Sequence, residues 1–178
     1  NKTSTIILTA GKGNTMLSSI PKPLHLNTGK TMLQWVMDAN KSAGIKKLVV
    51  VVSQEFDKLD FNNKNVIKAI QKKPLGTGDA VSKALPLLKN FEGVVLICFA
   101  DTPFITSKTL KKIVKSFKNG NDLVLTGFKK NEKNNYGRII FDKNKKPNQI
   151  LEHKDIKRNK VDSNFCNGGI MGIHSSCL

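Results

Sequence analysis

The hydrophobic residues in the first two-thirds of the chain alternate between short aliphatic runs and longer stretches with helical spacing. In the runs nearly every position is apolar, as in LVVVV at residues 48–52, which is typical of strands buried on both faces of a parallel sheet. These runs predict strands at Thr5–Leu8, Leu48–Val52, Val66–Ile70, Gly93–Phe99 and Asp122–Thr126. The helical spacing predicts helices at Thr31–Ala43, Ala80–Leu88 and Thr106–Phe117.

The pattern changes after Phe128. A charged, asparagine-rich loop is expected at Lys129–Asn135, followed by short strands at Arg138–Phe141, Gln149–Glu152 and Asn167–Ile173. This order predicts an α/β, Rossmann-like fold of three layers, with a mostly parallel sheet and a small β-rich lobe. We expect one domain, with a core at residues 1–128 and the lobe at residues 129–178.

The composition indicates a globular protein of a reducing compartment. The chain has 178 residues, of which 39% are hydrophobic, enough for a sizeable core. It has no apolar run of about 18 residues, and its first residues lack the features of a signal peptide. The three cysteines and three histidines show no metal-ligand spacing. We therefore expect a cytoplasmic protein with no membrane partner and no zinc site.

The formal net charge is +17, which is typical of proteins that bind nucleic acid or other polyanions. This charge comes almost entirely from lysine, because Arg138 and Arg158 are the only arginines. Nucleic-acid readers favour arginine for bidentate base contacts and aromatic residues for stacking, and few aromatics lie among these lysines. The pattern favours a solvated surface that attracts anionic small molecules, with nucleic acid as an alternative partner.

Two loops in the first quarter of the chain carry candidate phosphate contacts. Gly11, Lys12 and Gly13 follow the first predicted strand, where glycines let backbone N–H groups approach a phosphate. Their spacing fits neither the P-loop nor the dinucleotide fingerprint, so a tight turn is the alternative. Lys22 lies between two prolines, which restrict the backbone and suit a cation aimed at a phosphate. An ordinary surface lysine is the alternative there.

Two further motifs lie near the ends of predicted strands, where ligands bind in open α/β sheets. Asp101 follows a wholly apolar strand, and a carboxylate at such a position is a common Mg²⁺ ligand in phosphoryl-transfer enzymes. A cap before Pro103 is the alternative. The sequence LGTGDA at residues 75–80 leads into a helix. It is either a loop that contacts a small planar ligand or a turn with Thr77 or Asp79 as the N-cap.

A series of motifs occurs in order along the chain: LTAGKGxxM, IPKPL, GKxML, LGTGDA, ADTPF, YGRI, EHKD and NGGI. Together they resemble the sugar-1-phosphate nucleotidyltransferases. They most closely resemble the pyrophosphorylase domain of the bifunctional N-acetylglucosamine-1-phosphate uridylyltransferase / glucosamine-1-phosphate acetyltransferases. The resemblance extends from Ile6 to Ile173. It implies a nucleotide-binding core at residues 1–128 and the start of a sugar-binding lobe at residues 129–178, in a single, C-terminally incomplete domain.

The resemblance implies a role for each matching position. Lys22, Lys12 and Asp101 are implied to act in catalysis, and Asp101 is also implied to bind the expected cofactor, Mg²⁺. The positions that match nucleotide-binding residues are Leu8, Thr9, Ala10, Gly11, Gln71, Gly76 and Thr77. Of these, Gln71 is implied to contact the uracil edge. The positions that match the sugar site or line it are Phe99, Ala100, Gly137, Glu152 and Asn167.

The implied reaction forms UDP-N-acetylglucosamine and pyrophosphate from UTP and N-acetylglucosamine 1-phosphate, for cell-wall and lipopolysaccharide synthesis. A sugar-phosphate oxygen attacks the α-phosphorus of UTP in line, so the protein mainly positions the substrates and neutralises charge. A related sugar-1-phosphate or nucleotide is an alternative substrate.

The chain departs from the family pattern at three places. Thr15 stands where the family has an arginine that clamps the triphosphate, and Ala100 stands where it has a glycine. Loss of a bidentate clamp implies a rate lower by about 10²- to 10³-fold. The family also has a second metal-binding asparagine, in a region that follows the motifs matched here. These departures leave a non-catalytic or truncated nucleotide-sugar-binding module as the alternative. The family's trimers are built by a separate β-helix, so we expect a monomer.

Overall fold

Two compact units make up the described part of the protein. The computed structural model describes residues 2–9, 24, 26–27, 29–131, 134–158 and 163–178. The first unit comprises Asn1–Val124 and Met171–Leu178, and the second comprises Leu125–Ile170. The strand β10 (Phe165–His174) therefore contributes its last residues to the first unit and the others to the second.

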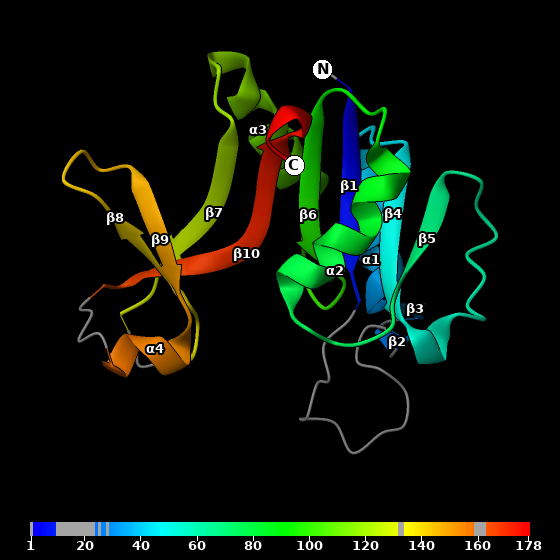
Figure 1. Ribbon diagram of the computed structural model, residues 1–178, viewed down its shortest axis with the longest axis horizontal. Helices are drawn as coiled ribbons and strands as arrows, with labels where there is room; N and C mark the ends of the chain where they lie inside the picture. Colours follow the sequence, from blue (N-terminus) through cyan, green and yellow to red (C-terminus); the bar gives the residue numbers. More distant parts are fainter. Residues whose placement is uncertain (1, 10–23, 25, 28, 132–133, 159–162) are drawn as a thin grey trace. The chain divides into compact units, whose positions relative to one another are not determined.

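The sheet of the first unit has the strand order β5-β4-β1-β6-β10 (Figure 1). Its parallel strands are β1 (Thr3–Leu8), β4 (Lys47–Ser53), β5 (Val66–Gln71) and β6 (Val94–Phe99). Met171–His174 of β10 pairs with β6 in the antiparallel direction. The parallel strands consequently end at one edge of the sheet, and the predicted α/β fold with a mostly parallel sheet is confirmed.

Helices cover both faces of this sheet, as expected for strands that are apolar on both sides. The helices are α1 (Met32–Ser42), α2 (Thr77–Ala84) and α3 (Ser107–Ser116). Figure 1 shows α2 in front of the sheet and α1 and α3 behind it. Ile6 and Val49 share a buried cluster with Ala80 of α2. On the other face, the buried hydroxyl of Thr5 donates a hydrogen bond to Asn40 Oδ1 of α1 at 2.7 Å.

Short elements complete the first unit. A small antiparallel pair, β2 (Leu26–Asn27) with β3 (Lys30–Thr31), precedes α1. Turns of 3₁₀ helix occur at η2 (Gln54–Phe56), η3 (Leu85–Leu88), η4 (Phe117–Asn119) and η5 (Ser175–Cys177).

The second unit is built mainly from antiparallel strands. They are most of β7 (Leu123–Lys129), β8 (Arg138–Phe141), β9 (Pro147–Leu151) and the first part of β10. The strand β8 pairs with both β9 and β10, and β7 also pairs with β10. A short helix, α4 (His153–Arg158), follows β9. The second unit is therefore β-rich, as the short strands expected after Phe128 predict.

Two helices differ from the sequence pattern. The helix predicted at Ala80–Leu88 begins at Thr77 and changes to the 3₁₀ turn η3 at Leu85. Pro86 explains this change, because it lacks the N–H that an α-helical hydrogen bond needs. The helix α4 was not predicted. Its sequence, HKDIKR, has a single apolar residue, so it shows no apolar stripe.

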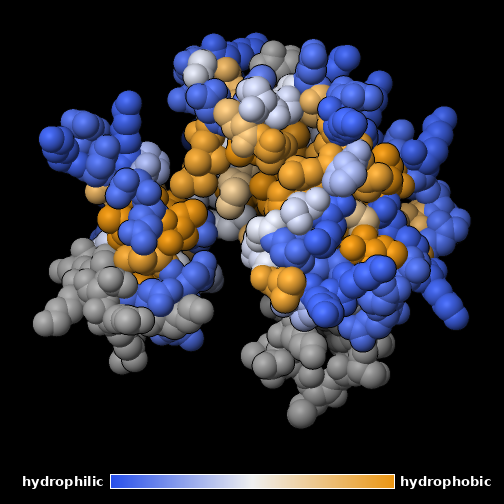
Figure 2. Space-filling view, viewed as in Figure 1, coloured by the Kyte–Doolittle hydropathy of each residue, from blue (hydrophilic) through white to orange (hydrophobic). Residues whose placement is uncertain are grey.

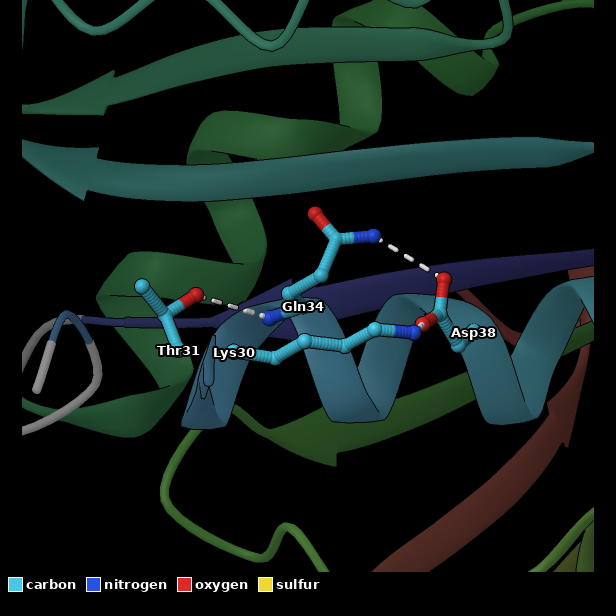
Figure 3. Close-up of polar contacts among 4 residues, drawn as sticks. All are labelled: Lys30, Thr31, Gln34 and Asp38. Atoms are coloured by element: carbon cyan, nitrogen blue, oxygen red, sulfur yellow. Dashed lines mark hydrogen bonds and ion pairs between the residues drawn. The ribbon is translucent and has the colours of Figure 1, made fainter. Parts of the chain in front are cut away.

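The start of α1 is held by local polar contacts (Figure 3). Thr31 is the N-cap, and its Oγ1 accepts a hydrogen bond from the backbone N–H of Gln34 at 3.1 Å. Asp38 accepts hydrogen bonds from Lys30 Nζ at 2.6 Å and from Gln34 Nε2 at 2.9 Å. Burial alone raises the pKa of Asp38. The hydrogen bonds from Lys30 and Gln34 and the charges of Lys30 and Lys41 outweigh that effect, and they hold the pKa below its ordinary value.

Asp38→Asn is expected to lower the free energy of unfolding by about 0.5–1 kcal/mol at pH 7. Because the pKa of Asp38 is lower in the folded state, its contribution is complete above the unfolded pKa of about 4. The contribution is lost as the pH falls through the folded value. Urea unfolding from pH 7 to about pH 3 measures the difference between the two proteins. If the difference in the free energy of unfolding stays constant over this range, the pKa of Asp38 is not lowered by folding. As a control, Lys30→Gln combined with Asp38→Asn should cost no more than Asp38→Asn alone.

Polar side chains cover much of the surface. On the face shown in Figure 2, hydrophilic residues occupy the periphery of each unit, in keeping with the many lysines. Among the described residues, no helix has the length and apolar content that a membrane-spanning segment requires.

Candidate functional site

Candidate ligand-binding residues gather at the carboxyl edge of the parallel sheet in the first unit. Thr9 directly follows β1, Gln71 is the last residue of β5, and Asp101 lies just beyond β6. These strands are parallel and belong to one sheet, so their ends lie along the same edge. The fold therefore brings together three segments that are far apart in sequence, at the edge where open α/β sheets bind ligands.

The turn after β6 presents Asp101. Thr102 folds back, and its Oγ1 donates a hydrogen bond to the carbonyl of Phe99 at 2.6 Å. The backbone N–H of Ala100 donates to the carbonyl of Leu8 at 2.9 Å, which ties the turn to the end of β1. Asp101 is exposed. The backbone on either side of Asp101 is thus anchored at the ends of β6 and β1.

The other predicted residues near these strand ends are more enclosed. Leu8 and Ala100 are buried, so a ligand reaches them through backbone atoms. Phe99 is partly buried. The Thr9 hydroxyl donates to the carbonyl of Val51 at 2.7 Å, so this side chain is engaged within the sheet.

The loop between β5 and α2 carries the next group of predicted residues. Gln71 is almost fully buried, and Gly76 and Thr77 are exposed. Gly76 has φ +113°, a backbone conformation that favours glycine. It is the residue that caps α2, without a side-chain hydrogen bond. The alternative in which Thr77 or Asp79 caps this helix is therefore wrong, because Gly76 occupies the cap position.

The side chain of Asp79 instead contacts Gln71. Gln71 Nε2 donates hydrogen bonds to Asp79 Oδ2 at 2.7 Å and to the carbonyl of Gly76 at 3.2 Å. Asp79 Oδ1 pairs with Lys83 Nζ at 2.9 Å. The hydrogen bond from Gln71, followed by that from Lys83, lowers the pKa of Asp79. The sequence pattern missed this contact, since an acidic residue in the first turn of a helix indicates capping or a favourable helix dipole.

In the second unit, the three residues predicted to bind the sugar lie together. A Cβ atom placed on Gly137 would lie 3.7 Å from Glu152 Oε2 and 3.8 Å from the Asn167 Cβ. The backbone N–H of Asn167 donates to the carbonyl of Gly137 at 2.8 Å. The Glu152 side chain is exposed. Three separate segments thus bring the Glu152 carboxylate and the Cβ of Asn167 next to a position that has no side chain.

Two features hold this cluster in shape. The buried guanidinium of Arg138 donates from Nε to the carbonyl of Ser163 at 2.7 Å and from an Nη atom to Asn134 Oδ1 at 3.0 Å. These contacts fix the segments on either side of Gly137 and before Asn167. Asn167 Oδ1 accepts from the N–H of Gly169 at 3.1 Å, which leaves its Nδ2 as the group that can donate to a ligand.

Several predicted residues lie outside the described part of the chain. They are Ala10, Gly11, Lys12 and Lys22, together with Thr15. Their assignments stay predictions from the sequence.

The chemistry of Asp101 fits a Mg²⁺ ligand. Mg²⁺ is usually held by one or two carboxylates, with water and substrate phosphates completing its coordination. An exposed carboxylate at the carboxyl edge of the sheet meets that requirement. Within the described ranges, no group of three or more His, Cys, Asp or Glu residues is arranged to hold a metal ion.

Cys98 is not part of this chemistry. Burial raises the pKa of its thiol to about 12, so it remains a neutral, apolar group within β6.

A mostly parallel sheet with polar residues at its carboxyl edge places the first unit in the Rossmann-like α/β class. Residues 5–152 match the family described as MobA-like NTP transferase domain, and the chain belongs to this family.

Curated relatives agree with this assignment, and a solved structure agrees with the fold. The bifunctional protein GlmU of Parvibaculum lavamentivorans is 37% identical over 182 residues, covering 100% of this chain and 40% of the relative. GlmU of Thermoanaerobacter pseudethanolicus is 42% identical over 153 residues, covering 85% of this chain and 33% of the relative. The crystal structure of HddC from Yersinia pseudotuberculosis superposes with a TM-score of 0.71 at 21% identity, covering 97% of this chain and 77% of that one. That structure supports the fold alone. The chain spans well under half the length of these GlmU relatives.

Proposed function

We propose that the chain is a sugar-1-phosphate uridylyltransferase. It joins UTP and N-acetylglucosamine 1-phosphate to form UDP-N-acetylglucosamine and pyrophosphate, with Mg²⁺ as cofactor. Membership of the NTP transferase family and the similarity to GlmU proteins support a nucleotidyl transfer reaction. The product would serve cell-wall and lipopolysaccharide synthesis in the cytoplasm.

The observation that carries the proposal is the cluster of Gly137, Glu152 and Asn167. These residues come from three segments, and in the structure they surround one position. A carboxylate accepts hydrogen bonds from sugar hydroxyls, and an amide Nδ2 donates to a carbonyl such as that of an N-acetyl group. A Cβ at Gly137 would lie 3.1 Å from the carbonyl of Leu151, so a larger residue there would press against the backbone next to Glu152.

In the proposed reaction, an oxygen of the sugar phosphate attacks the α-phosphorus of UTP in line and pyrophosphate leaves. The residues of the chain bind and orient the two substrates, which is the larger part of catalysis in such transfers. Lys22 and Lys12 are proposed to contact the phosphates. Asp101 would hold Mg²⁺, which when bound neutralises charge on the phosphates. At the other end of the nucleotide, Gln71 and the Gly76–Thr77 loop are proposed to contact the uracil.

Calorimetric titration with UTP and Mg²⁺ and with UDP-N-acetylglucosamine, beside a pyrophosphate-release assay, tests the proposal. Binding of both nucleotides, with pyrophosphate released only when N-acetylglucosamine 1-phosphate is present, is the expected result. Glucose 1-phosphate serves as the matched control, because it lacks the acetamido group that Asn167 is proposed to contact. Failure to bind either nucleotide would overturn the proposal.

A non-catalytic module that binds nucleotide sugars is the second candidate. The observation that favours it is Thr15 at the position of the family's arginine. Binding of UDP-N-acetylglucosamine without any release of pyrophosphate would support this candidate instead.

A further inference from the structure

The amide of Gln71 is fixed in one orientation. The side chain is only 2% exposed at the end of β5. Its Nε2 donates to Asp79 Oδ2 at 2.7 Å and to the Gly76 carbonyl at 3.2 Å. An amide nitrogen has two N–H donors, so these two acceptors use both of them. Turning the amide over would place Oε1 against two acceptor oxygens, and each contact would then be repulsive.

The two acceptors are themselves held in place. Asp79 lies in the first turn of α2, and its other carboxylate oxygen pairs with Lys83 Nζ at 2.9 Å. The Gly76 carbonyl also accepts from the N–H of Ala80 at 3.1 Å, and the positive φ of this glycine sets its direction. Both acceptors are therefore held at the N-terminus of α2.

We propose that Asp79 is a positioning residue that makes Gln71 read a nucleotide base as a hydrogen-bond acceptor. This inference rests on the proposed function, in which Gln71 contacts the base. With both Nε2 donors engaged, Oε1 is the atom with which the amide meets a base. As an acceptor, Oε1 can take a hydrogen bond from the N3–H of uracil. The N3 atom of cytosine carries no hydrogen and is itself an acceptor, so its lone pair would face the lone pair of Gln71 Oε1. The side chain pair thus favours uridine over cytidine nucleotides.

The charge state of Asp79 supports this arrangement. Its pKa lies below the ordinary value, with the hydrogen bond from Gln71 as the largest cause. Asp79 is therefore ionised at neutral pH and acts as an acceptor only. A protonated carboxyl or an asparagine amide would instead have a donor to offer, and that donor would allow the reversed orientation of Gln71.

The test measures the Kd for CTP divided by the Kd for UTP, which exceeds one when the protein prefers UTP. Each Kd is measured with Mg²⁺ on the full chain by calorimetry. The unmodified protein should prefer UTP. Asp79→Ala should lower the ratio about five- to tenfold, because only the Gly76 carbonyl then opposes the reversed orientation of the amide. Lys83→Gln is the matched control. It removes the ion pair but leaves both acceptors of Gln71, and it should keep the ratio within about twofold.

A second comparison shows whether Asp79 acts through Gln71. In a Gln71→Ala background, Asp79→Ala should have no further effect on the ratio. An equal effect in both backgrounds would overturn the inference, as would an unchanged ratio in a folded Asp79→Ala protein. If circular dichroism shows that Asp79→Ala does not fold, Asp79→Asn replaces it. That variant keeps the side-chain volume and should also lower the ratio, and an unchanged ratio there overturns the inference.

Failure of this inference can be told apart from failure of the proposed function. If the unmodified protein binds neither UTP nor UDP-N-acetylglucosamine, both are overturned. If it binds UTP and CTP equally, the selectivity inference alone is overturned.

Discussion

Asp101→Asn is expected to lower the rate of pyrophosphate release by about 10²- to 10³-fold. The substitution keeps the size of the side chain and removes the charge that we propose holds Mg²⁺. Asp101 is exposed at the carboxyl edge of the sheet, and the turn after β6 is anchored through Thr102 and Ala100. The stability of the protein should therefore change little. Initial rates over a series of Mg²⁺ concentrations measure the effect.

Asp122→Asn is a suitable control for this prediction. Asp122 is also exposed, and its carbonyl accepts from the N–H of His174, which pairs with Val94 at the start of β6. It therefore lies at the opposite edge of the sheet, and its replacement should leave the rate within about twofold. Equal rates for the Asp101→Asn variant and the unmodified protein would show that Asp101 does not hold the metal.

Thr15→Arg is expected to raise the rate of pyrophosphate release by about 10²-fold. A guanidinium donates two parallel hydrogen bonds to a phosphate, whereas a threonine hydroxyl donates one and carries no charge. Thr15 lies outside the described residues, and the prediction rests on its place in the motif GKGNTM. Single-turnover kinetics with saturating UTP would separate the chemical step from substrate binding.

Thr15→Lys tests whether geometry or charge causes the gain. Lysine adds a point charge without the planar fork, so its gain should be clearly smaller than that of arginine. If neither variant changes the rate, other groups already neutralise the triphosphate, and Lys12 is the first candidate for substitution. If the Thr15→Arg protein gains activity where the original has none, the original chain is a binding module.

Much of the fold could be predicted from the sequence because its strands are unusually uniform. Runs such as Leu48–Val52 and Gly93–Phe99 are apolar on both faces, and this pattern is typical of parallel strands between two layers of helices. The helix predicted at Thr106–Phe117 corresponds to α3, whose N-cap is Thr106, with Thr106 Oγ1 accepting from the N–H of Thr109. The residues within and next to each of these elements determine whether it is a strand or a helix, so the sequence alone is enough to predict them.

The candidate site could be predicted from the sequence only in part. The strand ends predicted the edge at which Thr9 and Asp101 lie, since parallel strands end on one side, whereas Gln71 was supplied by the family resemblance. The motif series supplied Gly137, Glu152 and Asn167 as positions of one sugar site, but without the contacts that bring them together. Their association depends on the pairing of β8 with β9 and β10, which is set by the packing of the whole second unit.

The sequence by itself determined the buried parallel strands, the three helices that cover them and the family. Only the tertiary structure decided which polar groups meet. Asp79 showed a capping pattern in the sequence, yet its carboxylate orients the amide of Gln71. The physical reason is that an apolar run carries its signal in neighbouring residues, whereas a hydrogen bond depends on direction and distance between groups that only the folded backbone brings within reach.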